Sequence, residues 1–149
     1  MEAYLDNSAT TRCSKAAADM VYKLLTEDFG NPSSLHMKGV IAENYINDAK
    51  KKIAKTLKVQ DKEILFTSGG TESNNLAIIG SVLANKRAGK HIITSSVEHA
   101  SVYSPMQFLE ELGFEVTYLP VNSDGQISVE KLKAAIRDDT ILVSLMHVN

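Results

Sequence analysis

The stretch that decides the fold is residues 91–119, which read HIITSSVEHASVYSPMQFLEELGFEVTYL. It begins with a short apolar run at 91–94, continues with an amphipathic segment at 100–112, and ends with a second apolar run at 114–119. Short apolar runs separated by helical segments are typical of strands that alternate with helices in a parallel sheet. We therefore expect a strand, a helix and a second strand over these residues.

The same alternation extends outward in both directions. Further strands are expected at 63–66 and 140–146, and further helices at 73–85 and 128–137. Upstream, apolar residues recur at helical spacing between 17 and 25 and between 42 and 57, which predicts two helices before the sheet. The fold class that follows is α/β, with a mostly parallel sheet and flanking helices.

Composition and charge narrow the function classes. A chain of 149 residues with 44% hydrophobic content can build one ordinary domain. The net charge is −2 with both signs interleaved, so we expect no nucleic-acid partner and no membrane surface. No segment approaches the roughly 18 to 20 apolar residues of a membrane span, and residues at the amino terminus show neither the basic region nor the apolar core of a signal sequence, so we expect none. A cytoplasmic protein is expected, and its single cysteine, Cys13, cannot form an internal disulfide.

The strongest local chemistry lies at residues 66–72, FTSGGTE, where a strand is expected to end and a helix to begin. Glycines allow a sharp turn there, and the free amides of a first helical turn can hold an anion. Thr71 adds a hydroxyl donor. The other interpretation is a plain turn in which Ser68 or Thr71 caps the helix. On the loop alone both interpretations stand, but a nucleotide is disfavoured because neither the Walker pattern nor GxGxxG is present.

Five ordered motifs give the chain a family resemblance. They are YLDNSATT at 4–11, NPSSLH at 31–36, TSGGTESNN at 67–75, EHAS at 98–101 and MHVN at 146–149. In order and spacing they resemble the cysteine desulfurase family, which belongs to class V of the aminotransferase-like enzymes. The resemblance implies part of the large domain of an aspartate-aminotransferase-type fold, pyridoxal phosphate held as a Schiff base to a lysine, and a homodimer. It also implies L-cysteine as substrate, L-alanine and an enzyme persulfide as products, and a sulfur-acceptor protein as a further partner.

The same resemblance assigns site residues. Gly70 and Thr71 correspond to residues that bind the cofactor phosphate, in agreement with the anion-binding interpretation of the loop. His99 corresponds to the catalytic histidine that stacks on the cofactor ring, where an imidazole can also exchange protons. Asn149 corresponds to the asparagine that reaches the ring, since an amide can donate to its phenolic oxygen. His147 is interpreted as structural.

The family comparison also divides the chain. Residues 1–14 are expected to belong to the small domain or to the active-site edge, and residues 15–149 to an incomplete large cofactor-binding domain. No residue matches the family's ring-nitrogen aspartate, Schiff-base lysine or mobile cysteine, and Cys13 lies where the family places no sulfur acceptor. We therefore expect the amino-terminal part of a longer enzyme, inactive by itself. The exposed edge of its last strand should cause self-association or marginal stability.

Other functions remain open at this point. A selenocysteine lyase or another class V aminotransferase would keep most of these motifs. A non-catalytic α/β module could bind a phosphorylated ligand through residues 68–71, and a scaffold would bind none. No metal site is expected, because the four histidines are far apart and lack the paired spacing of zinc ligands.

Overall fold

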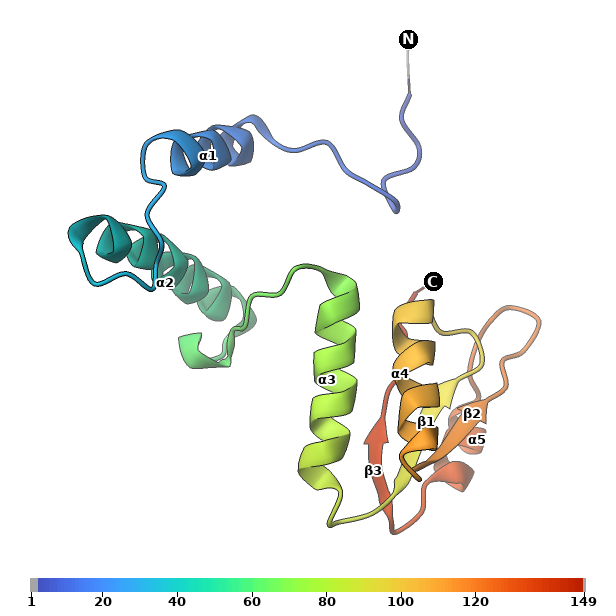
Figure 1. The fold of residues 1–149 in the computed structure, drawn as a ribbon. Coiled ribbons are helices and arrows are strands. Elements are labelled where there is room, and N and C mark those ends of the chain that lie inside the picture. Colours follow the sequence, from blue (N-terminus) through green and yellow to red (C-terminus); the bar gives the residue numbers. More distant parts are fainter. Residues whose placement is uncertain (1–2, 149) are drawn as a thin grey trace. The chain divides into compact units, whose positions relative to one another are not determined.

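The computed structural model describes residues 3–148, which form two compact units, one ending at Leu65 and one starting at Phe66. Figure 1 shows the path of the chain through both. The division after residue 14 remains a prediction. None of the helices in the described part of the chain is long and apolar enough to cross a membrane.

The first unit contains the two expected helices. They are α1 (Lys15–Thr26) and α2 (Met37–Leu57), followed by a single turn of 3-10 helix, η1 (Asp61–Glu63). Side chains between the helices form a polar cluster in which the Tyr45 hydroxyl donates to Asp28 over 2.7 Å and accepts from Lys23 over 2.8 Å. The bond from Tyr45, together with the Lys23 ammonium 3.2 Å from Asp28, lowers the pKa of the Asp28 carboxyl, so that Asp28 and Lys23 carry opposite charges.

The turn between α1 and α2 is stabilised by its own side chains. The Asn31 carboxamide oxygen accepts from the Ser33 N–H over 2.9 Å, and Nδ1 of His36 accepts from the Gly39 N–H over 3.3 Å, which caps α2. Gly39 is needed for close approach, because a Cβ there would overlap the carbonyl oxygen of Ser34. The NPSSLH motif therefore has a structural basis in this unit.

The second unit holds a parallel sheet of three strands. They are β1 (His91–Ser95), β2 (Glu115–Leu119) and β3 (Thr140–Val143), in the order β2-β1-β3. In the ladder His91 pairs with Glu115 on one side and with Thr140 on the other. These strands alternate with helices, which confirms the α/β fold class.

Three helices flank this sheet. They are α3 (Gly70–Asn85), α4 (Ala100–Glu111) and α5 (Val129–Ala135). In Figure 1, α3 and α4 lie side by side on the near face of the sheet and α5 lies behind it. This follows from chirality: the step from β1 to β2 and the step from β2 back to β3 run in opposite directions, so right-handed crossovers place their helices on opposite faces.

The core of the second unit lies between β1 and the helix pair α3 and α4. Its buried cluster consists of Ile78, Val82, Ile92, Val102, Met106 and Leu109. All five residues of β1 are buried, because this central strand is paired on both edges and covered on both faces. The glycine after α4, Gly113, has a φ of 85°, which allows the chain to turn sharply into β2.

The structure corrects two of the expected strands. Residues 63–66 are not a strand: Ile64 has extended backbone, but no strand among residues 3–148 pairs with it, and hydrogen-bonded pairing is what defines a strand. The strand expected at 140–146 ends at Val143. The Ser144 N–H still bonds to the carbonyl of Ile93 over 2.9 Å, but the Met146 N–H bonds to a side chain instead of the neighbouring strand.

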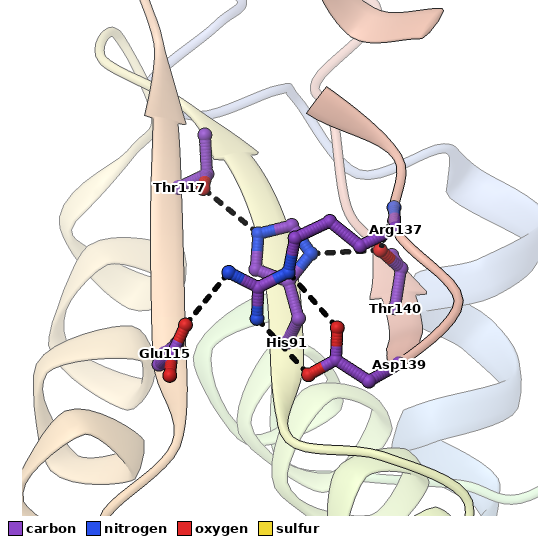
Figure 2. Close-up of polar contacts among 6 residues, drawn as sticks. All are labelled: His91, Glu115, Thr117, Arg137, Asp139 and Thr140. Atoms are coloured by element: carbon purple, nitrogen blue, oxygen red, sulfur yellow. Dashed lines mark hydrogen bonds and ion pairs between the residues drawn. The ribbon is translucent and has the colours of Figure 1, made fainter. Parts of the chain in front are cut away.

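A buried histidine connects all three strands at their amino-terminal end (Figure 2). His91 is 1% exposed, and its ring nitrogens lie 2.7 Å from the Thr140 hydroxyl and 2.8 Å from the Thr117 hydroxyl. Burial lowers the pKa of His91, with a further contribution from the positive charge of Arg137. Arg137 itself pairs with Asp139 through two nitrogens.

Candidate functional site

The amino terminus of α3 is open. Gly69 precedes the helix without a side-chain cap, and a Cβ on Gly69 or Gly70 would meet no atom within 4 Å. Among the described residues, the N–H groups of Gly70, Thr71 and Glu72 have no hydrogen-bond acceptor. Three free donors at the positive end of a 16-residue helix are suited to hold an anion.

The loop before α3 is held in shape by side chains. The hydroxyls of Thr67 and Ser73 lie 2.6 Å apart, and the Ser73 hydroxyl also donates to the Gly69 carbonyl over 3.1 Å. The Glu72 carboxylate accepts from both the N–H and the hydroxyl of Ser68, each over 2.6 Å, and these bonds lower its pKa. The carboxylate is thus engaged by Ser68 and leaves the first-turn amides of α3 free.

His99 begins the neighbouring helix. It is the N-cap of α4, where its Nδ1 accepts the N–H of Ser101 over 3.0 Å. The side chain of Asn74, one turn into α3, donates to the Ser101 hydroxyl over 2.8 Å. The docking of α3 on α4 therefore brings the helix turn that carries Gly70 and Thr71 next to the turn that carries His99.

A carboxylate links the ends of β1 and β3. Glu98 accepts from the Ser95 hydroxyl over 2.7 Å and from the Met146 N–H over 2.9 Å. It therefore holds the residues after β3 beside the loop that carries His99. In open parallel sheets, ligands bind outside the carboxyl ends of the strands, which is the edge at which these contacts lie.

A cavity of about 630 Å³ opens at the same edge. Its lining includes Ser95, Met146 and His147, but neither His99 nor the α3 terminus. The candidate site is thus an exposed surface formed by two helix starts, with a separate hollow beside it.

The sequence-predicted residues have different outcomes. The structure brings Gly70, Thr71 and His99 to neighbouring helix starts, whereas Asn149 lies outside the described residues. Cys13 is exposed in the first unit, with its Sγ 3.5 Å from the Ser14 carbonyl. Residues 3–148 contain no cluster of three His, Cys, Asp or Glu side chains that could hold a metal ion.

No role was expected for Asn74, Ser101 or Glu98, although all three lie within the motifs that carry the family resemblance. Their hydrogen bonds join segments 27 and 48 positions apart, so no local signal could predict the partners. The spacing of the motifs showed only that these residues belong to the same part of the chain.

Comparison with known proteins agrees with the family resemblance of the sequence motifs. The aminotransferase class-V family model matches residues 3–149. Cysteine desulfurase IscS of Dictyoglomus turgidum is 52% identical over 148 residues, which is 99% of this chain and 38% of that protein. Cysteine desulfurase IscS of Methanosarcina thermophila is 52% identical over 146 residues, covering 98% of this chain and 36% of that protein.

Solved structures agree in fold. A NifS-like protein has a TM-score of 0.94 and 38% identity over the whole chain, which covers 41% of that structure. The structure described as SspA in complex with cysteine has a TM-score of 0.90 and 40% identity, with 98% of this chain and 42% of that one covered. The chain spans less than two fifths of the length of the two IscS relatives. Motifs, fold and comparisons together establish that the chain belongs to the aminotransferase class-V family, within which the relatives it resembles are cysteine desulfurases.

Proposed function

We propose that this chain supplies the phosphate-binding and ring-covering part of a pyridoxal-phosphate-dependent cysteine desulfurase. The observation that carries the proposal is the open start of α3, with three free N–H groups, docked beside a histidine at the start of α4. The start of α3 is suited to an anion, and the start of α4 carries an aromatic ring. Pyridoxal phosphate has a phosphate group for the first and a pyridine ring that can stack on the second.

The residues present fit the cofactor. Its phosphate would be held by the N–H groups of Gly70 and Thr71 and by the Thr71 hydroxyl, which has no acceptor among the described residues. The His99 ring, exposed at the start of α4, would cover one face of the pyridine ring. Asn149 would donate to the phenolic oxygen, as its place in the family motif suggests.

The division of chemistry follows from these positions. Bound pyridoxal phosphate acts as an electron sink for cleavage at the substrate's α-carbon substituents. The chain's own residues bind the phosphate, orient the ring, and hold a proton at Nε2 of His99, the ring nitrogen that faces away from the helix cap. The proposal also includes L-cysteine as the substrate, assembly into a homodimer, and a sulfur-acceptor protein as a partner. It is supported by the names of the relatives and by the solved structure described as a complex with cysteine.

A chimeric enzyme tests the proposal. Residues 1–149 would replace the matching segment of the Dictyoglomus turgidum relative, to which they align over 99% of their length. We expect a protein that absorbs as a bound pyridoxal Schiff base and releases sulfide from L-cysteine. The 149 residues by themselves are expected to release none. A chimera that folds by circular dichroism but binds no cofactor would refute the proposal.

The phosphate contact can be tested separately in the same chimera. Thr71→Val removes one donor to a charged group, which is typically worth about 1.5–3 kcal/mol, so pyridoxal phosphate should bind about ten- to a hundredfold more weakly. Thr56→Val is the matched control, because among residues 3–148 the Thr56 hydroxyl bonds only to the Lys52 carbonyl of its own helix in the first unit. Equal cofactor affinity in the two variants would contradict the role of Thr71.

A further inference from the structure

Three side chains from two helices form a polar chain beside the candidate site. The Asn74 amide nitrogen donates to the Ser101 hydroxyl oxygen over 2.8 Å, and that oxygen lies 2.8 Å from Nδ1 of His99. The backbone N–H of Ser101 donates to the same ring nitrogen over 3.0 Å. Asn74 lies in α3 while His99 and Ser101 start α4, so the chain connects the two elements that carry the candidate residues.

The hydrogen bonds between Asn74, Ser101 and His99 determine which nitrogen of the His99 ring carries the proton. Nδ1 of His99 accepts a backbone N–H and therefore carries no proton in the neutral ring. Because the Ser101 hydroxyl oxygen accepts from the Asn74 amide, its own proton is free to point at Nδ1. Two donors then converge on Nδ1, and the single proton of the neutral imidazole is on Nε2.

We propose that Asn74 and Ser101 are positioning residues that hold the His99 ring in one orientation and in the Nε2–H tautomer. The inference deepens the proposed function and rests on it for its meaning in catalysis. With Nδ1 engaged, any proton that His99 exchanges with a bound ligand passes through Nε2. The ring presents one defined donor to the site instead of two interchangeable nitrogens.

Capping alone does not require this arrangement. The helix start is capped by the bond from the Ser101 N–H to His99, which any residue at position 101 except proline could make. The Ser101 hydroxyl and the Asn74 amide are additional, and Ser101 is only 8% exposed, so its hydroxyl is directed inward at a cost in desolvation. That cost is offset only by the two partners described here.

A second contact fixes the same junction. Pro105 lacks an N–H, so the Ser101 carbonyl loses the helical partner four residues later. The Asn75 side chain lies 3.4 Å from that carbonyl and donates to it, and it also donates to the Thr71 carbonyl over 2.9 Å. The turn that carries Thr71 is therefore tied to the residue that orients His99.

The tautomer can be measured directly by NMR on the ¹⁵N-labelled 149-residue chain, without cofactor. At about pH 8.5, where free histidine is neutral, long-range ¹H–¹⁵N spectra distinguish a protonated from an unprotonated ring nitrogen. His99→Gln identifies the His99 signals by their loss. His147 is exposed and has no side-chain hydrogen bond within residues 3–148. In the same spectrum it therefore reports the ratio of the two tautomers in a solvated ring.

We expect the Nε2–H form of His99 to exceed the other tautomer at least about tenfold, which one net hydrogen bond is enough to produce. Ser101→Ala removes one of the two donors, and Asn74→Asp reverses the hydroxyl by accepting its proton. Each should lower the preference at least about threefold. Ser104→Ala and Asn85→Asp, in the same two helices and without contact to His99, should leave it unchanged.

The outcomes separate this inference from the proposed function. A His99 ring that averages its tautomers as His147 does overturns the inference, as does a preference that both test variants leave intact. A fixed Nε2–H ring that responds to Ser101→Ala and Asn74→Asp supports it. If the chimera then binds no pyridoxal phosphate, the proposed function fails while the inference about the ring stands.

Discussion

Replacing the buried histidine of the central strand should change both the stability of the second unit and its dependence on pH. In His91→Leu a side chain of similar size replaces a ring that is hydrogen-bonded on both sides. The Thr140 hydroxyl keeps a partner, because it also accepts the Arg137 N–H over 2.8 Å. The Thr117 hydroxyl loses its only partner in the described chain. A stranded, partly buried hydroxyl costs about 1–3 kcal/mol, so we expect a loss of this size near pH 8.

The sign of the pH dependence follows from the lowered pKa of His91. Burial is the main cause and Arg137 adds to it, while Asp139 and Glu115 act in the opposite direction. Below about pH 6.5 the unfolded chain binds a proton at this residue and the folded protein resists doing so. Wild-type stability should therefore fall as pH drops below about 6.5, by at most about 1.4 kcal/mol per pH unit from this group. The leucine variant lacks this contribution, so the gap between the two proteins should narrow in acid.

Urea denaturation between pH 5 and pH 8, with hydrogen exchange of the β1 amides as a local probe, measures both effects. Thr117→Val is the matched control, because it removes a partner but keeps the titrating ring. It should lose stability at pH 8 and retain the wild-type acid slope. If His91→Leu and the wild type have the same acid slope, His91 is not held neutral by the fold and the reasoning is refuted.

Three further substitutions test single contacts. Glu98→Ala removes the charged acceptor of the Met146 N–H. We expect hydrogen exchange of that amide to become at least about tenfold faster. An unchanged rate would contradict the link between the ends of β1 and β3. Gly39→Ala would normally favour a helix by up to about 1 kcal/mol, but here the new Cβ meets the Ser34 carbonyl oxygen, so thermal melts should show net destabilisation. Thr94→Val should stabilise the second unit by about 1 kcal/mol in urea, because the buried Thr94 hydroxyl has no partner in residues 3–148; a loss of stability would reveal a partner.

Much of the fold could be predicted from the period of the apolar residues. The alternation across residues 91–119 gave a strand, a helix and a strand, which the structure confirms as β1, α4 and β2. The error at residues 63–66 has a physical cause: an apolar run predicts extended backbone, but a strand also needs a neighbour to pair with. Periodicity describes one segment at a time and cannot show whether another segment lies beside it.

The candidate site was predictable only in part for a similar reason. Glycines before a helix are a local signal, so the sequence pointed to an anion site at Gly70 and Thr71, whereas His99 was assigned only through the family resemblance. Their roles toward a cofactor stay proposals. The link between Asn74 and Ser101 depends on how two helices dock, and that is determined by the core between α3, α4 and β1. No motif of either helix alone specifies it.

The structure also changes how the histidine should be interpreted. From sequence, a histidine before a helix is either a structural cap or a functional side chain, and the two interpretations compete. An imidazole has two nitrogens, however, and in this chain the cap occupies only Nδ1 of His99. The cap bond and the Ser101 hydroxyl, which is itself held by Asn74, both lie at Nδ1, so Nε2 is the ring nitrogen left available as a donor. The structural role and the proposed chemical role of His99 are therefore compatible, and a test that separates them must follow the state of each nitrogen, because activity alone would be lost in either case.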